Sequence, residues 1–187
     1  MGGSGRRMGG VAKGLLRAPV SDETLVERLL RVCSRAAPEA QVYLVGESSA
    51  YAALGVTTLT DAPAGVGPLG GLRSLLLEAR DNGAVSALAL ACDLPFLDET
   101  VLARLLLPLS GAARVPIADG RDQPLAAAYA PEETLRAVDA LLAQKRHRML
   151  GVLGELGSRV ERVTFDGDSA SALRDWDTPE DVKGNGV

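Results

Sequence analysis

Residues 84–92 read AVSALALAC, and the next residue is Asp93. Almost every side chain in this run is apolar or small, without alternating polar positions, which is typical of a strand buried on both faces of a parallel sheet. A residue that directly follows such a strand lies at its carboxyl end, where open α/β sheets bind ligands. The stretch therefore predicts a central parallel strand and places Asp93 at a candidate site.

Helices and strands alternate along the rest of the chain. Apolar residues at helical spacing predict the helices, and short β-branched runs predict the strands. The first helix is expected to be capped by Ser21 and to run to about Ala37, and strands are expected at 41–46 and 56–59. A second helix should run from the GVGPLGG cluster to near Asn82, and a third, capped by Asp98, should run to Leu107. Paired segments at 113–118 and 123–129 around the turn DGRD, helices opened by Pro131 and near 148–156, and a late strand at 159–165 should follow. This order predicts one α/β domain over residues 1–182, built on an open, mostly parallel, mixed sheet, and a polar tail at 183–187.

The composition excludes several classes of protein. The 187 residues carry a net charge of −4, and 47% are hydrophobic whereas only 3% are aromatic, which fits a single globular domain and argues against a nucleic-acid binder. No apolar run reaches the ~20 residues that span a bilayer, and there is no signal-peptide core, so we expect a cytoplasmic protein without a membrane segment. Cys33 and Cys92 lack C-x-x-C spacing and there is 1 histidine, so neither a zinc site nor a disulfide framework is supported.

The first residues, MGGSGRRMGG, are rich in glycine and arginine, and Lys13 follows shortly after. Bare backbone N–H groups in such a loop can surround phosphates while the cations neutralise them. The segment does not match a P-loop, because Lys13 is preceded by Ala12 and not by glycine. By itself it is equally consistent with a basic terminus that has no binding role.

Five motifs occur in a specific order from the first residues to Val182. They are GGSGRRMGGVAKGLL, DAPAGVGPLGGL, ACDLPFL, DGRDQPLAAAY and DWDTPEDV. In this order they resemble the molybdenum cofactor guanylyltransferase family. The resemblance implies a Rossmann-like, three-layer nucleotide-diphospho-sugar transferase fold. It also implies the transfer of GMP from GTP to molybdopterin with release of pyrophosphate, and Mg²⁺ as the cofactor.

The resemblance also implies roles for individual residues. Asp93 is similar to the family's magnesium-binding aspartate, Lys13 and Arg7 are expected to act on the phosphates with it, and Asp61 lies in a segment expected against the nucleotide. The full set of nucleotide-binding candidates is Gly2, Gly3, Lys13, Asp61, Gly67, Pro68, Leu69 and Asp93. For Asp93 the alternative is a helix-cap or loop aspartate, and for the glycines it is a tight turn.

The late motif departs from the family pattern, because Asp175 and Asp177 stand where guanylyltransferases usually show asparagine. Asp177 is a candidate second carboxylate for magnesium, or simply the cap of a terminal helix. Asp175, Arg146 and Arg148 are weaker candidates for binding the acceptor, although a basic run is more often a solvated surface. These departures keep open a cytidylyl or other nucleotidyl transferase of the same fold, or a weakly catalytic accessory homologue.

In the fold that the resemblance implies, an apolar strand precedes the glycine-rich loop and lies at the centre of the sheet. We therefore expect the natural chain to be longer at its front, with this first strand lacking in the present sequence. The expected partners are GTP and molybdopterin, with transient contacts to other cofactor-assembly proteins.

Overall fold

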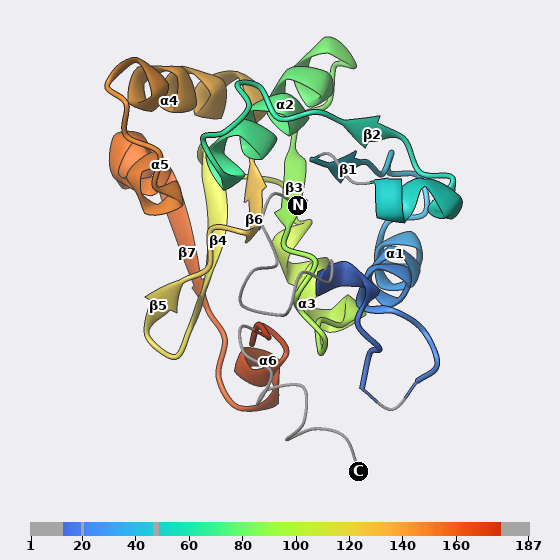
Figure 1. The fold of residues 1–187 in the computed structure, drawn as a ribbon. Helices are drawn as coiled ribbons and strands as arrows, with labels where there is room; N and C mark the ends of the chain where they lie inside the picture. Colours follow the sequence, from blue (N-terminus) through green and yellow to red (C-terminus); the bar gives the residue numbers. More distant parts are fainter. Residues whose placement is uncertain (1–12, 20, 47–48, 177–187) are drawn as a thin grey trace.

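The computed structural model describes residues 13–19, 21–46 and 49–176. In this part of the chain, seven strands form two sheets, shown in Figure 1. They are β1 (Leu44–Val45), β2 (Thr58–Leu59), β3 (Ala87–Leu90), β4 (Ala113–Ala118), β5 (Arg121–Asp122), β6 (Ala126–Tyr129) and β7 (Val160–Thr164). β1 and β2 pair in parallel as a small sheet, and the other five strands form the large one.

The large sheet is mixed. Its strand order is β3-β6-β4-β5, and β7 pairs in parallel with β4. Because β6 is antiparallel to both β3 and β4, the strands β3, β4 and β7 all run in the same direction. The turn between β4 and β5 has Asp119 and Gly120 at positive φ, of 50° and 71°, as the DGRD motif predicts for a hairpin.

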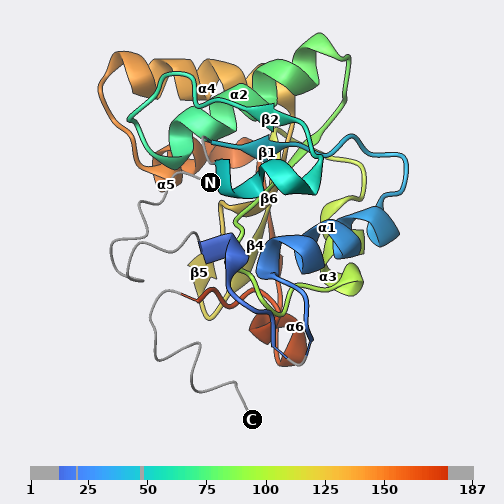
Figure 2. The ribbon, with the colours of Figure 1, turned by 45° about the vertical axis from the view of Figure 1, so that its right-hand side comes forward.

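Helices cover both faces of the sheet, so the protein has three layers (Figure 2). On one side lie α2, α4 and α5, and on the other lie α1, α3 and α6. Their bounds are α1 (Leu25–Ala36), α2 (Pro68–Asp81), α3 (Glu99–Leu105), α4 (Pro131–Ala143), α5 (Met149–Leu156) and α6 (Asp168–Ser171), with short 3₁₀ segments η2 (Lys13–Leu15), η3 (Ser49–Leu54) and η4 (Gly157–Arg159). Among the described residues, no helix combines the length and the apolar character needed to cross a bilayer.

The core explains why β3 is almost entirely apolar. Ala87 and Ala89 pack in the cluster that contains α2, α4 and α5, whereas Leu88 and Leu90 pack against the cluster that contains α1 and α3. Successive side chains of a strand point to opposite faces, so a strand with a core on each face has no polar position to offer. The predicted core contact on both faces is confirmed for β3, where Ala87 and Ala89 are buried and Leu88 and Leu90 are partly buried, but Val85 of the predicted strand is 89% exposed.

The predicted neighbours of β3 are not all confirmed. Within the described residues β3 forms ladder pairs only with β6, and that pairing is antiparallel. The prediction that β3 pairs in parallel is therefore wrong for the edge that pairs with β6. There β6, which comes later in the chain, runs in the opposite direction.

The start of α1 also differs from the prediction. Thr24, and not Ser21, is the N-cap, because Thr24 and Glu27 form a capping box in which the Glu27 N–H donates to Thr24 Oγ1 over 3.3 Å and the Thr24 N–H donates to Glu27 Oε2 over 2.8 Å. The predicted cap of α3 is confirmed, since Asp98 Oδ1 accepts from the Val101 N–H at 2.9 Å. The helices predicted to begin at Pro131 and near residue 148 are confirmed as α4 and α5.

Candidate functional site

The site is centred on Lys13 and Asp93. Asp93 follows β3 after two residues, and Lys13 begins η2. The Lys13 ammonium donates to Asp93 Oδ2 over 2.9 Å, and the two side chains are 22% and 17% exposed. A partly buried ion pair of this kind is screened from water less than a surface pair. The fold thus places a cation and a carboxylate together at the end of a strand.

Trp176 ties the end of the described chain to this pair. The Lys13 ammonium also donates to the Trp176 carbonyl oxygen over 3.0 Å, and the Trp176 N–H donates to the Asp93 carbonyl oxygen over 2.9 Å. The indole is 2% exposed and meets the Phe96 ring edge-on, with the ring centroids 6.2 Å apart. Buried aromatic packing therefore fixes the carbonyl that receives Lys13. Sequence reasoning did not identify this backbone contact.

Tyr51 supports the same turn from η3, and sequence reasoning missed it as well. Its ring is 7% exposed, and its hydroxyl is hydrogen-bonded to the backbone of Gly14. A Cβ on Gly14 would lie 2.8 Å from the hydroxyl oxygen and 3.1 Å from Cε1 of the ring. The close approach of Tyr51 thus favours glycine at position 14. Because Gly14 follows Lys13 directly, this packing also positions the turn that carries Lys13. The only sequence signal was an aromatic residue soon after a predicted strand.

A cleft of about 1080 Å³ opens beside the Lys13–Asp93 pair. Its lining includes Lys13, Asp93, Tyr51, Gln123 and Asp175, together with residues of β1 and β3. Burial raises the pKa of the Cys92 thiol, which also lines the cleft, and the Asp93 charge raises it further. This thiol therefore stays protonated at neutral pH and does not supply a nucleophile.

The amino-terminal end of α2 is another part of the predicted site. Gly67, at a φ of 68°, precedes the helix, and Pro68 is its first residue and lines the cleft. Leu69 is fully buried in the core, and Asp61 lies behind the first turn of the helix, close to Gly71. Asp61 Oδ1 is buried and accepts no hydrogen bond within the described part of the chain. A buried carboxylate oxygen without a donor is uncommon in folded proteins.

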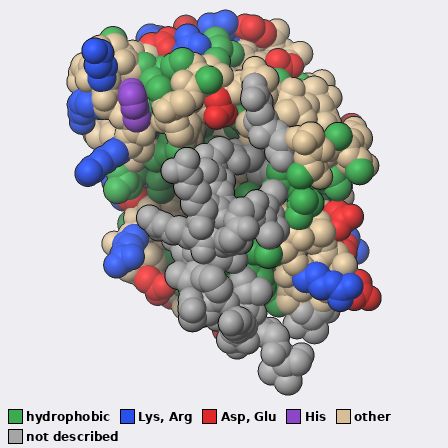
Figure 3. All heavy atoms as spheres, viewed as in Figure 1, with side chains coloured by type: hydrophobic (Ala, Val, Ile, Leu, Met, Phe, Trp, Pro, Cys, Tyr) green, Lys and Arg blue, Asp and Glu red, His purple; other side chains and the backbone are tan. Residues whose placement is uncertain are grey.

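The remaining predicted residues fall into two groups. Arg146 and Arg148 lie in and next to the link between α4 and α5, are exposed, and do not line the cleft, and Arg146 is paired with Glu155 at 3.1 Å. Figure 3 shows basic side chains gathered at this α4–α5 end of the molecule. Gly2, Gly3, Arg7 and Asp177 lie outside the described residues.

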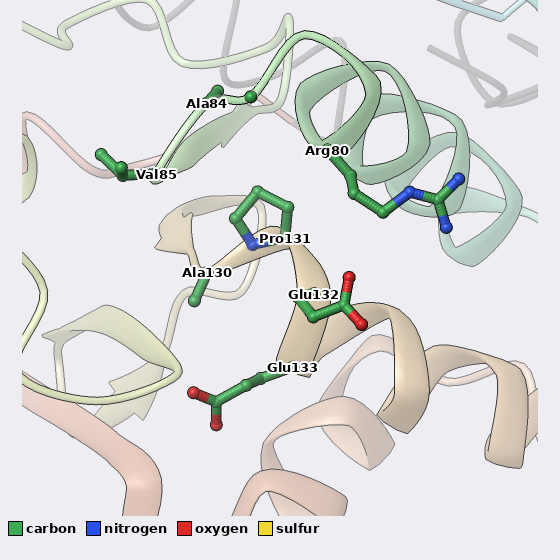
Figure 4. Close-up of a pocket in the computed structure, with 8 residues that line it drawn as sticks. Arg80, Ala84, Val85, Ala130, Pro131, Glu132 and Glu133 are labelled. Atoms are coloured by element: carbon green, nitrogen blue, oxygen red, sulfur yellow. The ribbon is translucent and has the colours of Figure 1, made fainter.

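A second, smaller pocket of about 340 Å³ lies between the end of α2 and the start of α4 (Figure 4). Arg80, Val85, Pro131, Glu132 and Glu133 line it. In Figure 4 the two glutamates point in different directions and do not converge on a common point. None of the predicted site residues lines this pocket, so the large cleft is the candidate site.

The side chains near Asp93 can be judged as ligands for Mg²⁺, the expected cofactor. No group of three or more histidine, cysteine or acidic side chains suited to a metal occurs in the residues described by the structure. Mg²⁺ is commonly held by one or two carboxylates, with substrate phosphates and water completing the shell. Asp93 and Asp175 are two carboxylates in the lining of an open cleft, which fits such a substrate-borne ion and does not fit a metal enclosed by protein alone.

Known proteins resemble the chain over most of its length. The family model for the MobA-like NTP transferase domain matches residues 1–160. A molybdenum cofactor guanylyltransferase from Rhodobacter capsulatus is 32% identical over 97% of this chain and 89% of its own length. A probable molybdenum cofactor guanylyltransferase from Methanothermobacter thermautotrophicus is 30% identical over 97% of this chain and 94% of its own length.

Solved structures show the same fold. Molybdopterin-guanine dinucleotide biosynthesis protein A from Archaeoglobus fulgidus has a TM-score of 0.73 at 22% identity, covering 98% of this chain and 93% of the other. The 2-C-methyl-D-erythritol 4-phosphate cytidylyltransferase from Thermus thermophilus has a TM-score of 0.63 at 18% identity, covering 92% of this chain and 91% of the other. The nucleotide-diphospho-sugar transferase fold predicted from the sequence is confirmed.

Proposed function

Since the chain belongs to the MobA-like NTP transferase domain family, we propose that it transfers GMP from GTP to molybdopterin and releases pyrophosphate. The observation that carries the proposal is the Lys13–Asp93 pair, which lies just after β3 in the lining of the large cleft. Relatives that share about 30% of its residues over nearly the whole chain are named molybdenum cofactor guanylyltransferases, which supports the choice of substrates.

The reaction asks for positioning and charge compensation. The terminal phosphate of molybdopterin attacks the α-phosphorus of GTP, so that one P–O bond forms while the bond from the α-phosphorus to the bridging oxygen breaks and pyrophosphate leaves. The attacking phosphate is already an anion, so no protein base has to remove a proton from it. This chemistry is compatible with a cleft that, in the described part of the chain, is lined by Lys13, Asp93 and Asp175 and by no histidine.

Lys13 is the cation assigned to the phosphates. Its ammonium is a compact charge with three donors, and two of the acceptors that it meets here are Asp93 Oδ2 and the Trp176 carbonyl. An arriving phosphate oxygen can compete for these donors. Arg7, which lies outside the described residues, is proposed as a second phosphate contact.

Asp93 is the proposed magnesium ligand, with Asp177 as the second candidate. When bound, Mg²⁺ would neutralise phosphate charge and fix the triphosphate. The chain's own contribution is to hold Asp93 in the cleft lining through the hydrogen bond from the Trp176 N–H to the Asp93 carbonyl oxygen and the ion pair with Lys13. Asp61, proposed to accept from the guanine ring N–H and amino group, lies behind the first turn of α2 and is not among the residues that line the cleft.

The proposal places the reaction in the cytoplasm, with transient contacts to other cofactor-assembly proteins. Cys33 and Cys92 are both free thiols, which suits a reducing compartment.

Thermal unfolding in the presence of each nucleotide with Mg²⁺ tests the base preference. A nucleotide at 100 times its Kd adds about 2.7 kcal/mol to the free energy of unfolding. GTP is expected to raise the midpoint of thermal unfolding, and CTP is expected to leave it nearly unchanged. The same measurement is made on Asp93→Asn, with Asp139→Asn as its matched control, because Asp139 is an exposed carboxylate paired with Arg73. Stabilisation by CTP alone would reject the guanine assignment.

A further inference from the structure

Trp176 belongs to a small apolar cluster that is distinct from the two larger cores flanking β3. The buried members of this Trp176 cluster are Ala18, Leu25 and Trp176, and the partly buried members are Leu16 and Phe96. They come from the segment after η2, the start of α1, the loop after β3 and the end of the described chain. The segments that carry Lys13 and Asp93 are thus joined by packing as well as by their ion pair.

The turn that carries Lys13 is fixed to the start of α1. The dark blue turn in Figure 2 is η2, and it lies beside α1. The Leu25 N–H donates to the Leu16 carbonyl over 2.9 Å, and the Ala18 N–H donates to the Glu23 carbonyl over 2.9 Å. Because Leu16 follows Lys13 by three positions, the packing of Leu16 and Leu25 determines where this turn lies.

The loop that carries Asp93 is held from the same side. Arg28 of α1 donates through Nη1 to the Leu97 carbonyl over 2.7 Å. One residue earlier, the Phe96 ring meets the Trp176 ring edge-on at an interplanar angle of 86°. The Trp176 N–H then donates to the Asp93 carbonyl over 2.9 Å, at the start of the loop. Both ends of this short loop therefore depend on α1 and on the Trp176 cluster.

Trp176 holds its place through its side chain. Residues 174–176 belong to no helix or strand, so no regular ladder fixes the backbone there. The indole, by contrast, is 2% exposed. Burial of a large aromatic ring is a strong anchor for an irregular segment. The two backbone contacts of Trp176, with Lys13 and with Asp93, thus depend on the packing of this ring.

We propose that Phe96 and Trp176 are positioning residues for the transfer reaction and act through Lys13 and Asp93. The inference rests on the proposed function, in which that pair receives the nucleotide. Neither ring is among the residues that line the cleft, so their effect on a ligand is indirect. A misplacement of about 1 Å in a site can cost roughly 100-fold in rate even when its cause lies away from the reacting atoms. Because the Trp176 cluster is distinct from the main cores, its substitutions should disturb the site before they unfold the chain.

The test uses substitutions of Phe96 in the full chain. Phe96→Ala removes the ring that meets Trp176, and Phe96→Leu keeps an apolar side chain in its place. Leu153→Ala is the matched control, because Leu153 is 3% exposed in a main core and belongs to α5, away from the Trp176 cluster. All proteins are compared well below their unfolding midpoints. Should Phe96→Ala not fold, Phe96→Leu gives the same readings with smaller effects.

Amide hydrogen exchange at Trp176 reports the positioning without any nucleotide, since this N–H donates to the Asp93 carbonyl. Phe96→Ala should speed this exchange by about 10-fold or more, because the segment opens locally once its anchor is weakened. Phe96→Leu should recover part of the protection. Leu153→Ala should leave exchange at Trp176 nearly unchanged.

The affinity for GTP with Mg²⁺ is measured in a double-mutant cycle with Lys13→Met. Phe96→Ala should raise the Kd by about 10-fold, near the lower end of what a hydrogen bond to a charged group contributes. Leu153→Ala should leave the Kd unchanged. In the Lys13→Met background, Phe96→Ala should have little further effect, because the charge that it positions is already absent.

Unchanged exchange at Trp176 in Phe96→Ala would overturn the inference. So would additive effects of Phe96→Ala and Lys13→Met on the Kd, or equal effects of Phe96→Ala and Leu153→Ala. If exchange at Trp176 speeds up while Lys13→Met leaves the affinity for GTP unchanged, the positioning role is supported and the proposed nucleotide site fails.

Discussion

The Lys13 ammonium and the Asp93 carboxylate lie 2.9 Å apart although they are separated by 80 positions in the chain. The carboxyl end of a buried strand supplies the aspartate, and a single 3₁₀ turn supplies the lysine. Trp176 contacts both residues through its backbone, so three distant segments converge on one ion pair.

Replacing Asp93 by asparagine keeps the size of the side chain and removes its charge. If this carboxylate positions the phosphates and their metal, kcat for pyrophosphate release should fall by about 100-fold or more, because electrostatic positioning of this kind is worth several kcal/mol of barrier. Steady-state kinetics with GTP and molybdopterin measure the change. Asp139→Asn should retain normal turnover, and an equal loss in both variants would contradict a specific role for Asp93.

Lys13 is expected to act as a charge on the bound triphosphate. Lys13→Met keeps most of the side-chain stem but loses the donor, and the KM for GTP should rise about 10- to 100-fold, in line with the value of a hydrogen bond to a charged group. Lys13→Arg should recover part of the loss, because it restores the charge but not the compact geometry. Identical kinetics for the Met and Arg variants would show that charge is not what Lys13 provides.

Tyr51 is a positioning residue for the turn that carries Lys13. Gly14→Ala should weaken GTP binding and lower the unfolding midpoint, because its Cβ would lie 2.8 Å from the Tyr51 hydroxyl oxygen. Adding Tyr51→Phe removes that atom and should restore part of the loss, whereas Tyr51→Phe alone should cost roughly 1 kcal/mol, the usual value of one hydrogen bond. Additive effects of the two substitutions, measured in a double-mutant cycle, would contradict this direct contact.

Much of the fold was readable from the sequence because it depends on local patterns. The apolar face of α2 and the cap at Asp98 required only spacing and neighbouring residue types. The misplaced start of α1 was readable too, since Thr24 has Glu27 at the third helical position and Ser21 has Thr24 there. The partner of β3 was not readable, because pairing with β6 depends on contacts between segments distant in sequence.

The same division applies to the site. Asp93 was found because a buried strand directly precedes it, and Lys13 was found through the order of motifs. Tyr51 and the Trp176 carbonyl were missed because their contacts with the turn at Lys13 are made by backbone and packing across the fold. Periodicity carries no information on such contacts.

Glu161 provides a test of the scaffold away from the site. Its carboxylate accepts from Arg114 at 2.8 Å, and this hydrogen bond holds the Glu161 pKa below its ordinary value of 4.5. A lowered pKa in the fold means that the pair stabilises the protein above about pH 4.5 and that this contribution is lost as the pH falls through the lowered value. Glu161→Gln should therefore reduce stability by about 1 kcal/mol at pH 7, with turnover unchanged.

Unfolding curves of the two proteins between pH 7 and pH 3 should converge at the acid end. A difference that stays constant over this range would show that the charge of Glu161 is not what stabilises the fold.

The identity of the dinucleotide product shows which nucleotide the protein transfers. The protein is incubated with molybdopterin, Mg²⁺ and equal concentrations of GTP and CTP, and the product is identified by mass spectrometry while pyrophosphate is counted. The account predicts a product heavier than molybdopterin by one guanylyl group, with one pyrophosphate released for each, and its loss in Asp93→Asn. A cytidylyl product, or none from a protein that binds GTP, would contradict it.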